Sequence, residues 1–119
     1  MIPKITKGNA FSFKVEIFRD NIPLDIEKYD TKVFLISPMG KRYKVNIYEN
    51  ESNYIICDFK ENIPSLIYGF EILLNNDNEK LRLPIKEGLE IVEYSVQSDP
   101  YKTNEYNTTN NTKVIISIK

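Results

Sequence analysis

The strongest constraint on the fold is a two-residue alternation between residues 11 and 19. Its apolar positions are Phe11, Phe13, Val15 and Ile17, and its polar positions are Ser12, Lys14 and Glu16. Successive side chains of a strand leave opposite faces of the backbone, so this period predicts a half-buried β-strand. An apolar face with two phenylalanines and two β-branched residues must pack against a second apolar layer.

Short apolar runs of the same kind recur along the chain, with turn signals between them. Pro38-Met39-Gly40-Lys41 is one such turn, and residues 75–78 form a hairpin loop by composition. Only residues 25–30 are compatible with a helical turn. We expect about eight strands, at 11–19, 31–37, 42–48, 54–59, 66–74, 79–86, 89–94 and 113–119. The pattern therefore predicts an all-β protein, an antiparallel β-sandwich of the immunoglobulin type.

The C-terminal part differs in amino-acid composition from the rest of the chain. Residues 95–111 are mostly polar, which predicts a long loop or linker. The following residues alternate again, with Val114, Ile116 and Ile118 on one face. We expect a sandwich over residues 1–95 and a linker plus terminal strand over residues 96–119. That strand either completes its own sheet or adds to the sheet edge of a neighbouring subunit, so its three apolar residues are candidate protein contacts.

Length and charge limit the classes of partner. The 119 residues correspond to one domain, and 16 basic against 17 acidic residues give a net charge of −1. No overall field attracts nucleic acid or an anionic membrane. Neither a signal peptide nor a membrane span is expected, and the single cysteine, Cys57, excludes an intrachain disulfide, which fits folding in a reducing cytoplasm.

The residue types also argue against catalysis. The chain has no histidine, which removes the commonest general base and most zinc sites. Cys57 lies inside an expected strand and is interpreted as a buried core residue. The acidic residues at 25–30 and at 77–79 match no calcium-loop spacing, and the glycines form no phosphate loop. We therefore expect a protein that is not an enzyme and that has no cofactor and no metal.

Aromatic residues supply the remaining candidates for contact. Most of the eight tyrosines and six phenylalanines fall in the inward register of expected strands. Tyr48, Tyr101 and Tyr106 do not, and we interpret them as exposed candidates for contact with another protein. The tyrosine content leaves a carbohydrate-binding module as an alternative.

Three segments resemble a known domain type. They are Lys7-Gly8-Asn9-Ala10-Phe11-Ser12-Phe13, Arg19-Asp20-Asn21-Ile22-Pro23-Leu24-Asp25 and Tyr68-Gly69-Phe70-Glu71-Ile72. Together they are similar to the immunoglobulin-like domain that opens many bacteriophage baseplate, tail and virion-surface proteins, the baseplate upper protein N-terminal type, as in crAss-like phages. The resemblance covers roughly residues 5–95. In the third segment the aromatic residue follows the glycine directly, which departs from the spacing of the family.

The resemblance implies an assembly module located in the virion and made in the host cytoplasm. Larger members continue into fibre or receptor-binding regions, whereas this chain stops at Lys119. We therefore expect a capsid auxiliary (decoration) protein, with a tail or baseplate adaptor as the alternative. The expected partners are other virion proteins, such as the major capsid or tail and baseplate proteins, and strand exchange between copies would give a homo-oligomer.

Overall fold

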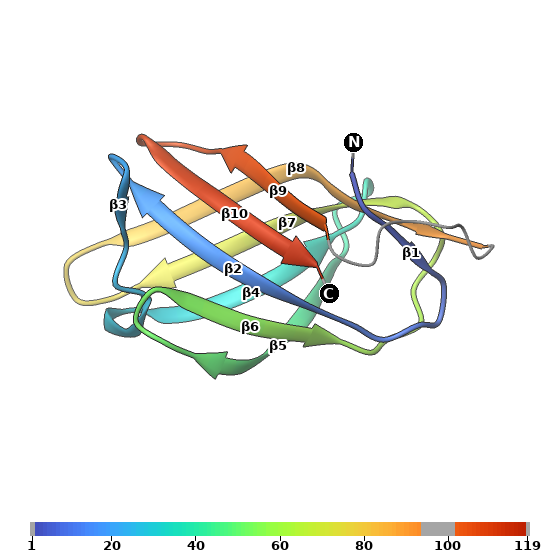
Figure 1. Ribbon diagram of the computed structural model, residues 1–119. Helices are drawn as coiled ribbons and strands as arrows, with labels where there is room; N and C mark the ends of the chain where they lie inside the picture. Colours follow the sequence, from blue (N-terminus) through green and yellow to red (C-terminus); the bar gives the residue numbers. More distant parts are fainter. Residues whose placement is uncertain (1, 94–101, 119) are drawn as a thin grey trace.

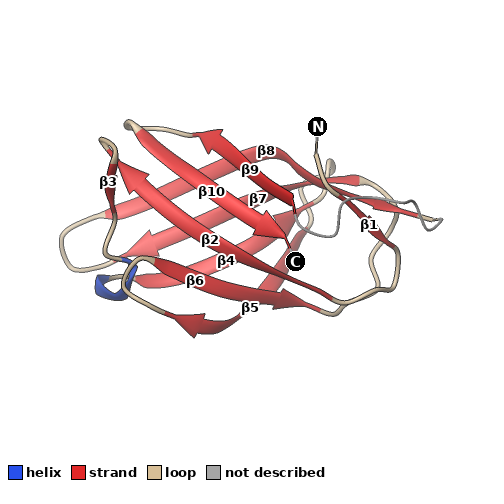
Figure 2. Ribbon diagram, viewed as in Figure 1, coloured by secondary structure: helices blue, strands red, loops and turns tan. Residues whose placement is uncertain are grey.

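A computed structural model describes residues 2–93 and 102–118 of the chain (Figure 1). These residues form ten strands and one short 3₁₀ helix (Figure 2). The elements are β1 (Lys4–Thr6), β2 (Phe11–Arg19), β3 (Ile22–Pro23), η1 (Ile26–Lys28), β4 (Asp30–Ile36), β5 (Arg42–Asn50), β6 (Tyr54–Phe59), β7 (Ile67–Asn75), β8 (Lys80–Val92), β9 (Lys102–Asn107) and β10 (Thr112–Ile118). The all-β prediction is confirmed, and the single turn of helix lies where the sequence allowed one.

The strands form one strongly curled sheet rather than two separate sheets. Their order is β1-β8-β7-β4-β5-β6-β2-β10-β9, with β3 paired to the end of β2. The sheet is mixed, because β1 pairs with β8 in parallel whereas the other pairs are antiparallel. β5 makes the bend: its first half pairs with β4 and its second half with β6, with a register shift after Ile47. Because β5 pairs with strands of both layers, the two layers expected from the sequence are parts of one continuous sheet.

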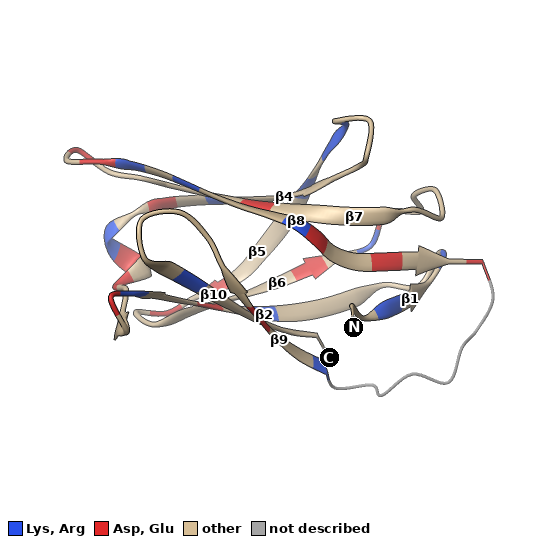
Figure 3. Ribbon diagram, turned by 90° about the horizontal axis from the view of Figure 1, so that it is seen from above, with Lys and Arg blue, Asp and Glu red and all other residues tan. Residues whose placement is uncertain are grey.

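Curling brings two limbs of the sheet face to face (Figure 3). One limb holds β1, β8, β7 and β4, and the other holds β6, β2, β10 and β9. The alternating apolar residues of both limbs point into the space between them and are buried. The rings of Phe13 on β2 and Phe70 on β7 lie 5.2 Å apart across that space. The face predicted for residues 11–17 is therefore the centre of the core.

The C-terminal strand belongs to the sheet of its own chain. β10 lies between β2 and β9 and pairs with both. Of the two alternatives open from the sequence, the structure has the strand completing its own sheet. The expected linker is wrong over residues 102–107, which form β9. Its sequence, Lys-Thr-Asn-Glu-Tyr-Asn, is polar and has no apolar alternation. β9 is an edge strand, and its backbone pairing with β10, not a pattern of apolar side chains, makes it a strand.

The two strands predicted at 79–86 and 89–94 are one strand, β8, with an interruption. Phe70 pairs with Ile85 and Tyr68 pairs with Leu89, so three residues of β8 stand opposite Gly69 alone. The extra residues, which include Gly88, bulge out of the ladder without ending the strand. A glycine in a strand pattern indicates a bulge as readily as a strand end.

A polar contact ties the two limbs together at one end. Glu79, directly before β8, accepts hydrogen bonds from the hydroxyl of Tyr29, which follows η1, and from Arg19 Nη2 at the end of β2, the latter at 3.1 Å. These two donors lower the pKa of the Glu79 carboxyl below its ordinary value of 4.5, the Tyr29 hydrogen bond having the larger effect. The carboxylate is thus stabilised by folding.

Replacing Glu79 with Gln should give a pH-dependent loss of stability. A carboxyl whose pKa is lowered in the folded state contributes stability above its unfolded value, near 4.5, and that contribution disappears as pH falls through the folded value. Urea unfolding should therefore separate Glu79→Gln from the wild type at neutral pH and bring the two together in acid. Glu61→Gln, at an exposed loop carboxylate, is the control. A gap between Glu79→Gln and wild type that stays constant with pH would contradict this role.

Candidate functional site

Three features of the described residues bear on function: groups of metal-ligating side chains, apolar helices and the single thiol. Within residues 2–93 and 102–118, no three His, Cys, Asp or Glu side chains lie close enough together to hold a metal ion. In the same residues, no helix is long and apolar enough to cross a membrane. The Cys57 thiol is completely buried, and burial, followed by the charge of Asp58, raises its pKa to about 12. A thiol with that pKa stays protonated at neutral pH and is a poor nucleophile.

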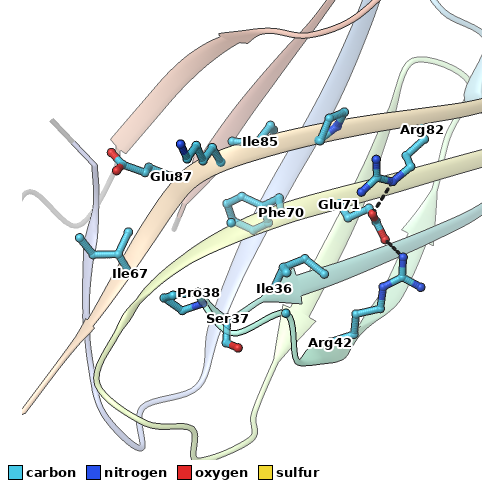
Figure 4. A pocket seen from close by; sticks show the side chains of 14 residues that line it. Ile36, Ser37, Pro38, Arg42, Ile67, Phe70, Glu71, Arg82, Ile85 and Glu87 are labelled. Carbon is cyan, nitrogen blue, oxygen red and sulfur yellow. Dashed lines mark hydrogen bonds and ion pairs between the residues drawn. The ribbon is translucent and has the colours of Figure 1, made fainter.

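A groove runs along the outer face of β4, β7 and β8 (Figure 4). It has a volume of about 740 Å³. Its walls are mainly apolar: Ile36 and Pro38 come from the end of β4 and the turn after it, Ile67 from β7, and Pro84 from β8. We call this surface the β7 groove. Grooves that combine apolar walls with a few polar groups are the usual form of binding sites.

Gly69 explains why the groove exists at this place. A Cβ atom on residue 69 would lie 2.4 Å from the carbonyl oxygen of Ile85 and 2.9 Å from that of Lys86. The bulged backbone of β8 therefore occupies the volume that a side chain at residue 69 would need. The absence of that side chain lets β8 fold over β7 and form one wall of the groove.

One end of the β7 groove carries a preorganised charge cluster. Glu71 points to the outer face but is only 2% exposed, because two arginines cover its carboxylate. Arg42 Nη2 lies 2.6 Å from Glu71 Oε1, and Arg82 Nε donates to Glu71 Oε2 at 2.6 Å. Figure 4 shows the three side chains in line, with Arg82 on β8, Glu71 on β7 and Arg42 on β5, across the end of β4. One carboxylate between two guanidiniums leaves this end of the groove with a net positive charge.

Arg42 is held in place from more than one side. The guanidinium of Arg42 also lies over the ring of Phe34 on β4, with its central carbon 5.3 Å from the ring centre. Fixed guanidiniums lose less conformational entropy when they bind an anion than free surface side chains do. At the other end of the groove Ile67 lies near Glu87, and Lys86 beside Glu87 also lines the groove (Figure 4).

The residues selected from the sequence do not form one site. Tyr48 is 68% exposed on β5, as expected. Tyr106 is half-buried, and its hydroxyl donates to the carbonyl oxygen of Gly88 at 3.2 Å, so it connects β9 to the opposite limb. Tyr101 lies outside the described residues.

A contact with a partner needs exposed side chains, but the three apolar residues of the terminal strand are buried. Val114, Ile116 and Ile118 are buried in the core of their own chain, pointing away from any free surface. An apolar alternation shows only that one face of a strand is buried. The pattern is the same whether that face is buried in its own chain or against a neighbouring subunit. In this structure they are therefore core residues rather than contact residues.

Sequence reasoning did not find the β7 groove. The alternation places Arg42, Glu71 and Arg82 on outward faces of their strands, yet nothing in the sequence says that these three positions are neighbours. The one available signal was Gly69, because a glycine inside a strand pattern indicates a bulge or a close backbone approach.

Comparison with known proteins adds no assignment at this point. No protein-family model matches the chain, and no curated protein is significantly similar to it. The shape and chemistry of the surface remain as guides to function, and the feature with the most definite shape and chemistry is the β7 groove.

Proposed function

We propose that this chain is a non-enzymatic structural protein of a bacteriophage particle that works by contact with other proteins. The observation that carries the contact role is the β7 groove: a hollow of about 740 Å³ with apolar walls and a fixed arginine pair at one end. A surface of this kind binds extended or protruding polypeptide without performing chemistry on it. In the described residues, the nucleophile candidate Cys57 is buried and protonated.

The virion assignment is supported by the resemblance of the opening segments to the immunoglobulin-like domains of phage baseplate and virion-surface proteins. An immunoglobulin-like fold is part of this proposal. It is consistent with two largely antiparallel limbs that face each other across a shared core. The first role we propose is a capsid auxiliary (decoration) protein, and a tail or baseplate adaptor is the second. The partners would be other virion proteins.

Quantitative mass spectrometry of purified phage particles tests this function. We expect the chain in a fixed ratio to the major capsid or tail protein, and we expect that ratio to survive gradient purification. A chain present in infected cells but missing from purified particles would overturn the proposal. The ratio itself separates the two roles, because a decoration protein is present in many more copies than a tail adaptor.

One observation favours a second candidate, a carbohydrate-binding module. The exposed Tyr48 lines a hollow of about 400 Å³ together with Asp58 and Lys60. An exposed ring beside charged hydrogen-bonding groups is a common way to bind a sugar. Binding on a glycan array that is lost in Tyr48→Ala would support this candidate.

A further inference from the structure

Arg42 and Arg82 of the β7 groove have N–H donors that do not bond to the Glu71 carboxylate. In the described residues, Arg82 reaches Glu71 through Nε and Arg42 through Nη2. The side chains are 64% and 52% exposed, and the remaining N–H groups of each guanidinium have no partner within residues 2–93 and 102–118. An arriving carboxylate can therefore take these donors while Glu71 stays paired.

A segment with matching chemistry lies exposed on the same chain, beside the β9–β10 hairpin, where the Asp20 N–H donates to the carbonyl oxygen of Asn111 at 3.1 Å. β2 and β3 are joined by a two-residue turn, Asp20-Asn21, in which both residues have positive φ, 53° and 65°. Such a turn makes a tight, well-defined hairpin tip. The next residue, Ile22, is 67% exposed, and the Asp20 carboxylate is in no ion pair within the described residues. The tip thus presents an acidic and an apolar side chain side by side.

Other exposed apolar residues do not match the groove equally well. Met39 is 89% exposed, but its turn contains no acidic residue that could pair with the arginines. Tyr48 lies within the long strand β5 and does not protrude. The hairpin tip combines the exposed apolar side chain of Ile22 with an exposed acid, Asp20, two residues away.

The tip and the groove lie toward opposite ends of the molecule, whose longest dimension is 44 Å (Figure 1). The tip therefore cannot reach the groove of its own copy, but it can reach that of a second copy. A contact between two different surfaces of identical chains leaves one free tip and one free groove at the ends of each pair. Such a contact continues head to tail into a ring or a row.

We propose that the β7 groove receives the Asp20–Ile22 tip of a second copy of this chain. The Asp20 carboxylate pairs with the free N–H groups of Arg42 and Arg82, and Ile22 packs against the apolar walls. This inference rests on the proposed function, because it takes the groove as a protein-contact site and names its occupant. It gives copies of the chain a way to line up on a particle.

Sedimentation velocity over a micromolar to millimolar range tests the contact. The wild type should form dimers and larger species as concentration rises, and added salt should weaken them because the contact includes a charge pair. Asp20→Asn, Ile22→Ser and Arg82→Gln should each weaken association about tenfold or more. Asn tolerates the turn's positive φ as Asp does. Asp77→Asn, in the β7–β8 loop, should associate like the wild type.

Mixing two variants tests the head-to-tail geometry. Ile22→Ser keeps an intact groove and Arg82→Gln keeps an intact tip. At a concentration where the wild type is associated, each variant alone should be mainly monomeric and their mixture should stop at a dimer. Circular dichroism verifies that both are folded. A wild type that is monomeric throughout, or a mixture that gives no dimer, overturns the inference. If the wild type does not self-associate but is still present in purified particles, the proposed function stands and the groove binds another virion protein.

Discussion

Removing residues 108–119 should leave a chain that does not fold. The deletion takes away β10, whose Val114, Ile116 and Ile118 are buried against the core, and leaves β9 without its partner. Burying one such side chain contributes about 1.5–3 kcal/mol. Three of them together approach the whole free energy of unfolding of a small domain, about 5–15 kcal/mol.

Circular dichroism and amide NMR dispersion of the truncated chain measure this directly. A point variant tests the same contact without removing the strand. Ile116→Ala should lower the free energy of unfolding, measured in urea, by about 2–5 kcal/mol. Ile115→Ala is the matched control, because its side chain leaves the same strand on the more exposed face. A truncated chain that stays folded and monomeric would contradict this account and would return the strand to the role of an arm for a neighbour.

Gly88→Ala should destabilise the protein as strongly as a large core deletion does. A Cβ atom on residue 88 would lie 2.2 Å from Cδ2 and 2.3 Å from Cε2 of Phe70. Phe70 is 1% exposed and packs against Phe13, so its ring has little room to move. Overpacking of this kind costs about 1–3 kcal/mol, and here the bulge of β8 and its hydrogen bond from Tyr106 would also shift.

A double-mutant cycle with Phe70→Leu separates the clash from general damage. Phe70→Leu alone should destabilise the core, but the smaller side chain should also relieve the contact with residue 88. The Gly88→Ala/Phe70→Leu pair should therefore lose clearly less stability than the sum of the two single variants, by about 1 kcal/mol or more. Additive losses in urea unfolding would show that the ring of Phe70 does not restrict residue 88.

Much of the fold follows from two-residue alternation. The strand at residues 11–19 and its inward face are observed where the pattern predicts them, and the helical turn is confined to the allowed segment. The errors lie where pairing, not side-chain pattern, decides the structure. β9 is polar and is a strand because β10 pairs with it, and β8 continues through Gly88 because a bulge absorbs the extra residues.

The β7 groove could not be predicted for a related reason. Arg42, Glu71 and Arg82 come from three strands and meet only because of strand order and register. A one-residue slip of any strand would move its side chain to the other face. The sequence pattern indicates which residues face outward, but it carries no information on which outward residues become neighbours.

A cryo-electron microscopy map of the phage particle tests the central claim, that this chain works as a structural component through surface contact. We predict density for the curled sheet in fixed positions on the particle, with the β7 groove covered by polypeptide and an acidic side chain beside Arg42 and Arg82. A particle that lacks this density, or one in which the groove faces solvent in every copy, would contradict the claim.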